Sequence, residues 1–358
     1  MKSKFYLPIL LFAAAVLLSG CITIGSGASK NNQVLNDGGI YRSTNKGNTW
    51  LQKTLVPTAS GKPASFGAFD AYALVRDPSD NKALYLAAIG EGLIYSYDGA
   101  ETWQRANSLG KMTIRSIAVD PSSKCVIYVS STNKVYKTTD CSRSWTQVFY
   151  DNDPRVNMES IAIDFKNPKI VFVGTSKGDV IRSLDNGESW QPVERFKSRV
   201  LRVMISPHDN RLMFVATERN GLFRSADGGI TWTALDQAMK RFKNSSSFKD
   251  LEFSGVSSST LFYASNYGLL KSADNGNGWS AIELLTAEAG ATINALAVDP
   301  KDDKLIYYVT NTTFYKTVDG GANWITKKLP TTRVGWTLLI DPVDTNIIYM
   351  GVRNLQKK

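Results

Sequence analysis

Seven copies of one eight-residue pattern run along this chain of 358 residues and constrain its fold more than any other feature. The pattern is Ser/Thr-x-Asp-x-Gly-x-Ser/Thr-Trp, and its copies occupy residues 43–50, 96–103, 138–145, 183–190, 225–232, 272–279 and 317–324. Their final Trp residues are spaced 53, 42, 45, 42, 47 and 45 positions apart. A repeat of this length indicates one supersecondary unit per copy, packed against its neighbours.

Each copy follows short runs that are rich in β-branched and aromatic residues, which are typical of strands. In the third unit these runs are 114–119, 126–130 and 134–137, and a fourth, 144–149, follows the turn. Four antiparallel strands in about 45 residues make one blade of a β-propeller. The sequence therefore predicts an all-β fold, a single seven-bladed propeller over residues 38–358.

The two ends of the chain predict how the ring closes. The first copy, with Gly39–Arg42 before it, supplies only the third and fourth strands of a blade. Trp336–Ile340 and Ile347–Val352, at the other end, supply the missing first two. We expect the two halves to pair in one blade, because closure removes the exposed edges of an open array.

The pattern resembles the Asp-box, or BNR, repeat of sialidases, sortilin-like domains, xyloglucanase-type hydrolases and photosystem assembly factors. Its Asp side chain is expected to pin a tight turn, its Gly to accept a positive φ, and its Trp to bury a large ring. Seven identical catalytic sites would make little chemical sense. We therefore interpret the residues at the Asp position as structural: Asn45, Asp98, Asp140, Asp185, Asp227, Asp274 and Asp319.

The N-terminus predicts export. Lys2 and Lys4 precede an apolar run of 14 residues, 5–18, which is shorter than the roughly 18–20 residues of a membrane-spanning helix. The run ends in Leu-Ser-Gly-Cys21, which resembles a bacterial lipobox and implies an acylated Cys21 after removal of residues 1–20. The alternative is an ordinary signal peptide cleaved nearby, with Cys21 incidental. Residues 21–37 would then form a lipidated tether to the propeller.

Two further cysteines, Cys125 and Cys141, flank a predicted hairpin centred near Asn133. Antiparallel pairing about that centre sets residue 125 beside residues 140–141, within the Cα separation that a disulfide requires. An extracytoplasmic compartment permits such a bond. The open alternative is a pair of buried free thiols.

Composition and motifs exclude several classes of function. The formal net charge of +10 falls to +8 once Lys2 and Lys4 leave, which suits anionic lipid, cell-wall polyanions, acidic partners or simple solubility. Nucleic acid is not an expected partner of an exported chain. The single histidine, His208, rules out a His-rich metal site and argues against a Ser-His-Asp triad. We expect no metal and no cofactor.

Propellers present ligand sites where their innermost strands begin, and the residues there differ from blade to blade. The candidate ligand-binding residues are Tyr72, Arg115, Glu159, Arg202, Asn294 and Trp336, the last being the one Trp outside the repeat. Glycoside hydrolysis usually needs two carboxylates about 5–10 Å apart. The candidate carboxylates are Asp70, Glu159, Asp250 and Glu252.

The predicted function is a non-enzymatic binding or assembly scaffold that recognises a protein segment or a glycan outside a membrane. Resemblance to sortilin-like and assembly-factor propellers implies such a role. The alternative is a lipid-anchored glycoside hydrolase. It is weakened because the sialidase Phe/Tyr-Arg-Ile-Pro signature is missing and xyloglucanase-type enzymes use two propellers. Ile22 replaces the Asp that retains such lipoproteins at an inner membrane, which favours an outer membrane or the cell surface.

Overall fold

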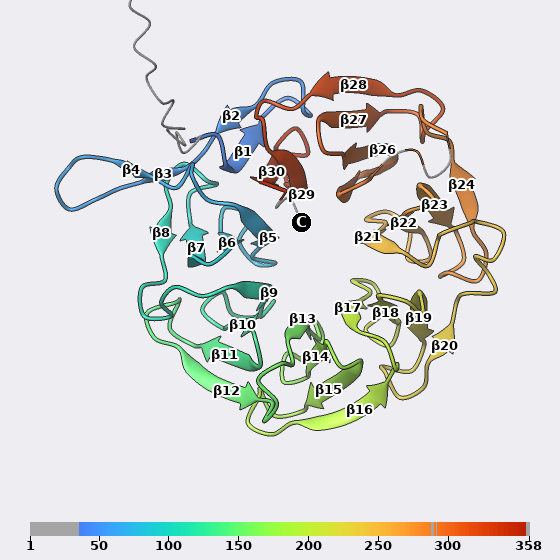
Figure 1. The fold of residues 1–358 in the computed structure, drawn as a ribbon, viewed down its shortest axis with the longest axis horizontal. Helices are drawn as coiled ribbons and strands as arrows, with labels where there is room; N and C mark the ends of the chain where they lie inside the picture. The colour runs from blue at the N-terminus through green and yellow to red at the C-terminus, as the bar shows by residue number, and fades with distance from the viewer. Residues whose placement is uncertain (1–35, 288–289, 291, 356–358) are drawn as a thin grey trace, which may run out of the picture. The chain divides into compact units, whose positions relative to one another are not determined.

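The computed structural model describes residues 36–287, 290 and 292–355. Seven four-stranded antiparallel sheets form a ring around a central axis (Figure 1). The predicted all-β, seven-bladed propeller is therefore confirmed. The predicted signal segment, Cys21 and most of the tether lie outside the described residues. No helix among the described residues is long and apolar enough to cross a membrane.

Each blade has an inner, a second, a third and an outer strand. We number the blades around the ring, beginning with blade 1, which joins the two ends of the chain, and give the strands in that order. The inner strands are β29 (Val334–Ile340), β5 (Ala71–Arg76), β9 (Ile114–Val119), β13 (Met158–Ile163), β17 (Val200–Ile205), β21 (Phe248–Phe253) and β25 (Ala295–Asp299). The second strands are β30 (Ile348–Arg353), β6 (Leu84–Ala88), β10 (Ile127–Ser131), β14 (Val171–Thr175), β18 (Met213–Thr217), β22 (Leu261–Ser265) and β26 (Asp302–Val309).

The third strands are β1 (Gly39–Ser43), β7 (Gly92–Ser96), β11 (Lys134–Thr138), β15 (Asp179–Ser183), β19 (Leu222–Ser225), β23 (Leu269–Ser272) and β27 (Thr313–Thr317). The outer strands are β2 (Leu51–Gln52), β8 (Gln104–Arg105), β12 (Thr146–Tyr150), β16 (Gln191–Arg195), β20 (Thr233–Ala234), β24 (Ser280–Ile282) and β28 (Ile325–Lys328). A further hairpin, β3 (Leu55–Val56) with β4 (Ala64–Ser65), projects outward between blades 1 and 2 (Figure 1).

Blade 1 is closed by strands from both ends of the chain, as the sequence predicts. β1 pairs with β30 in antiparallel register, from Gly39 opposite Val352 to Ser43 opposite Ile348. The sheet order is β2-β1-β30-β29, so the C-terminal strands lie inside the N-terminal ones. This pairing leaves no blade with an unpaired internal edge, and large apolar side chains fill the space between successive sheets.

The repeat turns are held by a network of side-chain and backbone hydrogen bonds. In the fourth copy, Ser183 Oγ accepts from the Gly187 N–H at 2.7 Å and donates to Asp185 Oδ1 at 2.8 Å. The Ser189 N–H donates to the same carboxylate at 2.9 Å. The Ser189 hydroxyl and backbone bonds lower the pKa of Asp185 to about 2. The same arrangement recurs in the first copy, where Asn45 replaces Asp and accepts from the Thr49 N–H at 2.9 Å.

The Trp residues of the repeat are less uniformly buried than expected. Trp103 is 0% exposed and Trp279 is 5% exposed, while the other five are half-buried beneath the outer strands. The Trp190 indole donates to the Val148 carbonyl at 3.1 Å, and the Trp324 indole to the Glu283 carbonyl at 2.8 Å. The short outer strands do not fully cover these rings, because each begins only after the Trp.

A second set of turns, between the inner and second strands, is also held by hydrogen bonds to carboxylates. Asp77 accepts from the Ser79 N–H at 2.8 Å, and four other blades repeat this bond. The residues at this position are buried and are Asp77, Asp120, Asp164, Asp299 and Asp341. Blades 5 and 6 carry Ser206 and Ser254 there instead. Each of these turns is held by hydrogen bonds within the turn itself, so its buried polar side chain stabilises the fold.

In blade 3, Cys125 and Cys141 are joined by a disulfide. The bond links the residues just before β10 to the repeat turn that follows β11. The hairpin register, with Ile127 opposite Thr138, brings the two cysteines together.

Replacement of Ser183 by Ala tests the repeat turn. Ser183 is 1% exposed, so the substitution leaves the Gly187 N–H buried without its acceptor. We expect the free energy of unfolding to fall by about 1–3 kcal/mol, measured by urea titration. Ser183→Thr is the matched control and should stay close to wild type, because Thr138 and Thr317 make the same bonds in their own turns. Equal stability of wild type and Ser183→Ala would contradict this account.

Candidate functional site

The inner strands all run in one direction, because every blade repeats the same strand order. Their first residues therefore meet on one face of the ring, which we call the front face. This face also carries the turns between second and third strands, and the segments that lead from each outer strand to the next blade. The opposite, back face carries the repeat turns and the turns between inner and second strands.

A β-bulge marks the start of six inner strands, at the same place in each blade. A bulge leaves one residue unpaired and re-aims its side chain. The bulged residues are Trp336, Tyr72, Arg115, Glu159, Leu201 and Lys249. In blade 7 Asn294 lies just before β25, and its N–H donates to the Val309 carbonyl at 2.8 Å. These residues form a non-repeating ring at the centre of the front face.

Sequence reasoning found most of this ring and missed two members. Tyr72, Arg115, Glu159, Asn294 and Trp336 lie in it. In blades 5 and 6 the candidates Arg202 and Asp250 lie one residue after the bulged Leu201 and Lys249. Aligning the first residues of these inner strands with those of blade 3, where the bulge follows Ile114, identifies Leu201 and Lys249 as the equivalent positions.

Glu159 is the most enclosed acid of the ring, with a side chain only 3% exposed. It lies between two guanidinium groups, at 3.3 Å from Arg115 of blade 3 and 2.9 Å from Arg199 of blade 5. Burial disfavours the charge on Arg199, but the pairing with Glu159 outweighs it and raises the pKa of Arg199. The three side chains bridge blades 3, 4 and 5, so Glu159 is committed to holding these blades together.

Asp250 joins blades 5, 6 and 7. It forms an ion pair with Arg202, and its second oxygen accepts from the Leu296 N–H at 3.0 Å. The hydroxyls of Ser116 and Ser160 accept from backbone N–H groups of the next inner strand in the same way, at Ile161 and Val203, both at 3.0 Å. The residue after each of these bulges thus links one blade to the next.

Glu252 differs from the other candidate carboxylates, because its side chain has no hydrogen-bond or ion-pair partner among the described residues. Burial, together with the neighbouring charge of Asp250, raises the pKa of Glu252 to about 8, and Arg202 only partly offsets this. Glu252 therefore keeps its proton at neutral pH. Of the four candidate carboxylates, Asp250 and Glu252 are the pair that the fold brings together.

The opposite side of the ring is aromatic and basic. The Trp336 indole donates to the Tyr72 carbonyl at 3.1 Å, and the Arg353 guanidinium stacks 3.3 Å from the centre of the Trp336 ring. Asp70, further out, accepts from the buried Arg333 at 2.6 Å. Asn294 bridges blades 7 and 1 through the Gly335 carbonyl at 3.0 Å.

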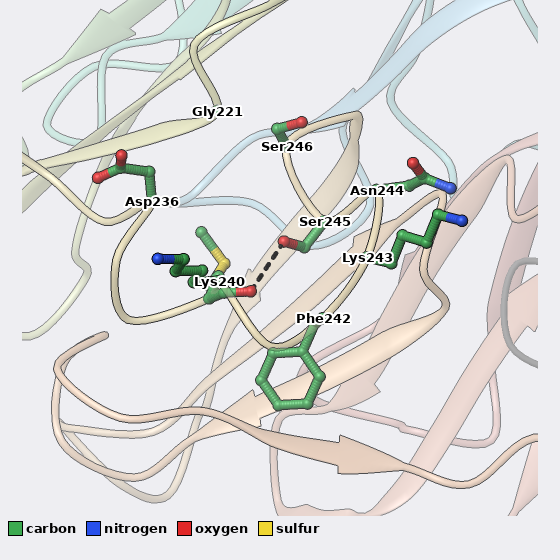
Figure 2. A pocket seen from close by; sticks show the side chains of 9 residues that line it. Gly221, Asp236, Lys240, Phe242, Lys243, Asn244, Ser245 and Ser246 are labelled. Atoms are coloured by element: carbon green, nitrogen blue, oxygen red, sulfur yellow. Dashed lines mark hydrogen bonds between the residues drawn. The ribbon is translucent and has the colours of Figure 1, made fainter.

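A recess of about 210 Å³ opens beside the ring on the front face, at the seam of blades 5 and 6 (Figure 2). It is formed by the segment 235–247, which leads from β20 to β21, and by Gly221 of the neighbouring turn. Met239 and Phe242 form its apolar base, and Ser245 Oγ donates to the Met239 carbonyl at 3.3 Å. Its polar lining consists of Asp236, Lys240, Lys243, Asn244, Ser245 and Ser246.

The remaining candidate features are a possible metal site and the single histidine, His208. No group of three or more His, Cys, Asp or Glu side chains within the described ranges is arranged to hold a metal ion. His208 is exposed on the back face, where its ring contacts the Ser254 carbonyl at 2.7 Å. The front face therefore offers a polar and aromatic binding surface, and Asp250 and Glu252 are neighbours along β21 beside it.

Residues 100–350 match the DUF6242 beta propeller domain family. The chain belongs to this family. Among curated proteins, this DUF6242 propeller is 28% identical over 210 residues to a xyloglucanase of Paenibacillus sp., which covers 49% of this chain. It is 23% identical over 191 residues to the photosystem II assembly protein Ycf48 of Thermosynechococcus vestitus, covering 52% of this chain and 50% of that protein. The matched part is only 20% of the xyloglucanase.

Solved structures share the fold of this DUF6242 propeller. The GH74 xyloglucanase of Xanthomonas campestris aligns with a TM-score of 0.64 at 16% identity, over 86% of this chain and 54% of that one. YCF48 bound to D1 peptide aligns with a TM-score of 0.62 at 15% identity, over 86% of this chain and 98% of that one. One propeller of this size thus corresponds to about half of the xyloglucanase and to nearly all of YCF48.

Replacement of Glu252 by Gln tests its protonation. An unfolded glutamate ionises near pH 4.5, whereas the folded chain keeps this proton up to about pH 8. The folded state holds the extra proton within this window, so the stability of the wild type should fall as pH rises through it. The Tm of Glu252→Gln should fall less between pH 5 and 8. Glu283→Gln, at an exposed glutamate, is the control and should keep the wild-type slope. Identical slopes for all three proteins would contradict the assignment.

Proposed function

We propose that this propeller is a non-enzymatic binding or assembly scaffold, held outside a membrane, which recognises a protein segment or a glycan on its front face. The observation that carries the proposal is that three of the four candidate carboxylates are committed to the fold. Asp70 is engaged by Arg333, Glu159 by Arg115 and Arg199, and Asp250 by Arg202. Acids held in this way are poor proton donors and nucleophiles but good organisers of a binding surface.

The length of the propeller relative to its structural relatives agrees with the proposed scaffold function. A single propeller suffices for YCF48, whose solved structure carries a D1 peptide, whereas the aligned region is about half of the xyloglucanase chain. The repeat residues resemble Asp-boxes, and we assign them to the turns rather than to a site. The ligand surface would then be the non-repeating ring, where Tyr72, Trp336 and Leu201 offer aromatic and apolar area among charged groups.

The rival function is glycoside hydrolysis, and one observation favours it. Glu252 keeps its proton at neutral pH and lies beside a second carboxyl group, Asp250, and a protonated carboxyl group is what the general acid of glycoside hydrolysis must supply. Asp250 is tied to Arg202 and to the Leu296 N–H, however, and this restricts its use as a base.

Affinity capture from detergent-solubilised envelopes of the source organism tests the scaffold. A double variant, Tyr72→Ala with Arg115→Ala, should lose at least about tenfold of the captured partner or glycan, because it removes two side chains of the ring. Tyr97→Ala with Arg143→Ala is the matched control on the back face and should retain capture. A parallel panel of chromogenic glycosides should give no turnover. Turnover abolished by Glu252→Gln or Asp250→Asn alone would replace the scaffold by a hydrolase.

We further propose that Cys21 is acylated and anchors the chain, at an outer membrane or the cell surface. The lipobox resemblance supports this. Cys21→Ser should move the protein from the membrane pellet to the soluble fraction after cell breakage. An unchanged distribution, or a mature protein whose mass lacks acyl chains, would refute the anchor.

A further inference from the structure

The front face is not uniformly charged, and one sector of it carries cations without partners. Elsewhere on this face several basic side chains are neutralised: Arg105 and Lys111 by Glu91, and Lys177 by Asp151. Lys134 and Lys328 form no ion pair among the described residues, but each stands singly in its blade. At blades 5 and 6, by contrast, five basic side chains of this face form neither an ion pair nor a side-chain hydrogen bond within the part of the chain that the structure describes. We call them the basic sector: Lys197, Arg219, Lys240, Lys243 and Lys249.

The basic sector is contiguous. The Arg219 N–H donates to Ser198 Oγ at 3.0 Å, which places the turn after β18 beside the segment that holds Lys197. Gly221 of the same turn lines the recess together with Lys240 and Lys243 (Figure 2). Four of the five side chains are exposed and Lys249 is half-buried.

Acids in this sector are too few or already engaged. Glu218 lies 3.8 Å from Arg199, and Asp250 is paired with Arg202. Glu252 is protonated at neutral pH. Asp236 lines the recess, and its one hydrogen bond there is a 3.5 Å contact from Gln237. The sector therefore presents net positive charge to solvent.

A second observation is that the first described residues, Asn36 and Asp37, lie on the same face. The described chain begins at Asn36 and enters β1 at its front-face end. Asp37 is held there by the Thr332 N–H at 2.8 Å and by Arg333 at 3.2 Å. Cys21 precedes Asn36 by 15 residues, which span at most about 50 Å when fully extended. An anchor at Cys21 would thus be attached to the front face at blade 1, across the ring from the basic sector.

We propose that the basic sector docks on the anionic phospholipid headgroups of the membrane that carries the anchor, so that blades 5 and 6 of the front face lie nearest the bilayer. This inference rests on the proposed membrane location. The lipid surface is the occupant that both observations support, because the cations and the chain leading to Cys21 share one face. A Lys or Arg near an anionic leaflet contributes about fivefold to the binding constant, and salt screens the contribution.

Vesicle co-sedimentation of residues 22–358 tests the proposal without the acyl chains. This part contains every strand of the closed ring. Wild type should bind vesicles of phosphatidylcholine with 30% phosphatidylglycerol at low salt and should not bind phosphatidylcholine alone. Lys240→Gln with Lys243→Gln and Lys249→Gln should weaken binding on the order of 100-fold, following the contribution of each cation. Lys124→Gln with Lys169→Gln and Lys304→Gln removes the same charge from the back face and should bind like wild type.

Three outcomes would overturn the proposal: wild type that does not bind the anionic vesicles, equal losses in the two triple variants, or binding that resists 0.5 M salt. Wild type that ignores vesicles but binds poly-glutamate through the same three lysines would assign the sector to an acidic protein segment instead. The readout does not depend on acylation or on the captured partner. A failed Cys21→Ser or capture experiment is therefore distinguishable from a failed vesicle experiment.

Discussion

The pairing of β1 with β30 is the contact on which the rest of the structure depends. Six blades are each made from one continuous stretch of chain, and the seventh exists only when residues from both ends meet in register. Once the ring is closed, every inner strand has a neighbour on both sides. The bridges from Arg115, Ser160, Asp250 and Asn294 to adjacent blades can then form together. The geometry of the front face is thus a consequence of closure.

The structure separates two kinds of polar residue that look alike in the sequence. Carboxylates that recur in most blades accept backbone N–H groups within their own turn, as Asp185 and Asp77 do. Carboxylates that occur once, such as Glu159 and Asp250, reach across a seam to a guanidinium of another blade. Both kinds of carboxylate are therefore engaged in holding the fold together. What distinguishes the front face is the remainder: the stacked Trp336 and the unneutralised basic sector.

The fold was predictable because it rests on local patterns that repeat. The repeat copies reveal the blades, and the half-blades at residues 39–52 and 334–353 reveal the closure. The partners of the candidate residues were not predictable, because they come from other blades. Nothing in the sequence near Glu159 indicates Arg199, which lies 40 residues further on. The one-residue offset at Arg202 and Asp250 arose because a bulge shifts register without changing the hydrophobic pattern.

The central claim is that the non-repeating residues of the front face bind other molecules, whereas the repeating residues of the back face stabilise the fold. Lysine cross-linking in intact cells, followed by mass spectrometry, tests this most directly, since both faces carry lysines. The account predicts that cross-links to other molecules concentrate at Lys111, Lys177, Lys197, Lys240 and Lys243 on the front face. Cross-links concentrated at Lys82, Lys124, Lys169 and Lys304 on the back face would contradict it.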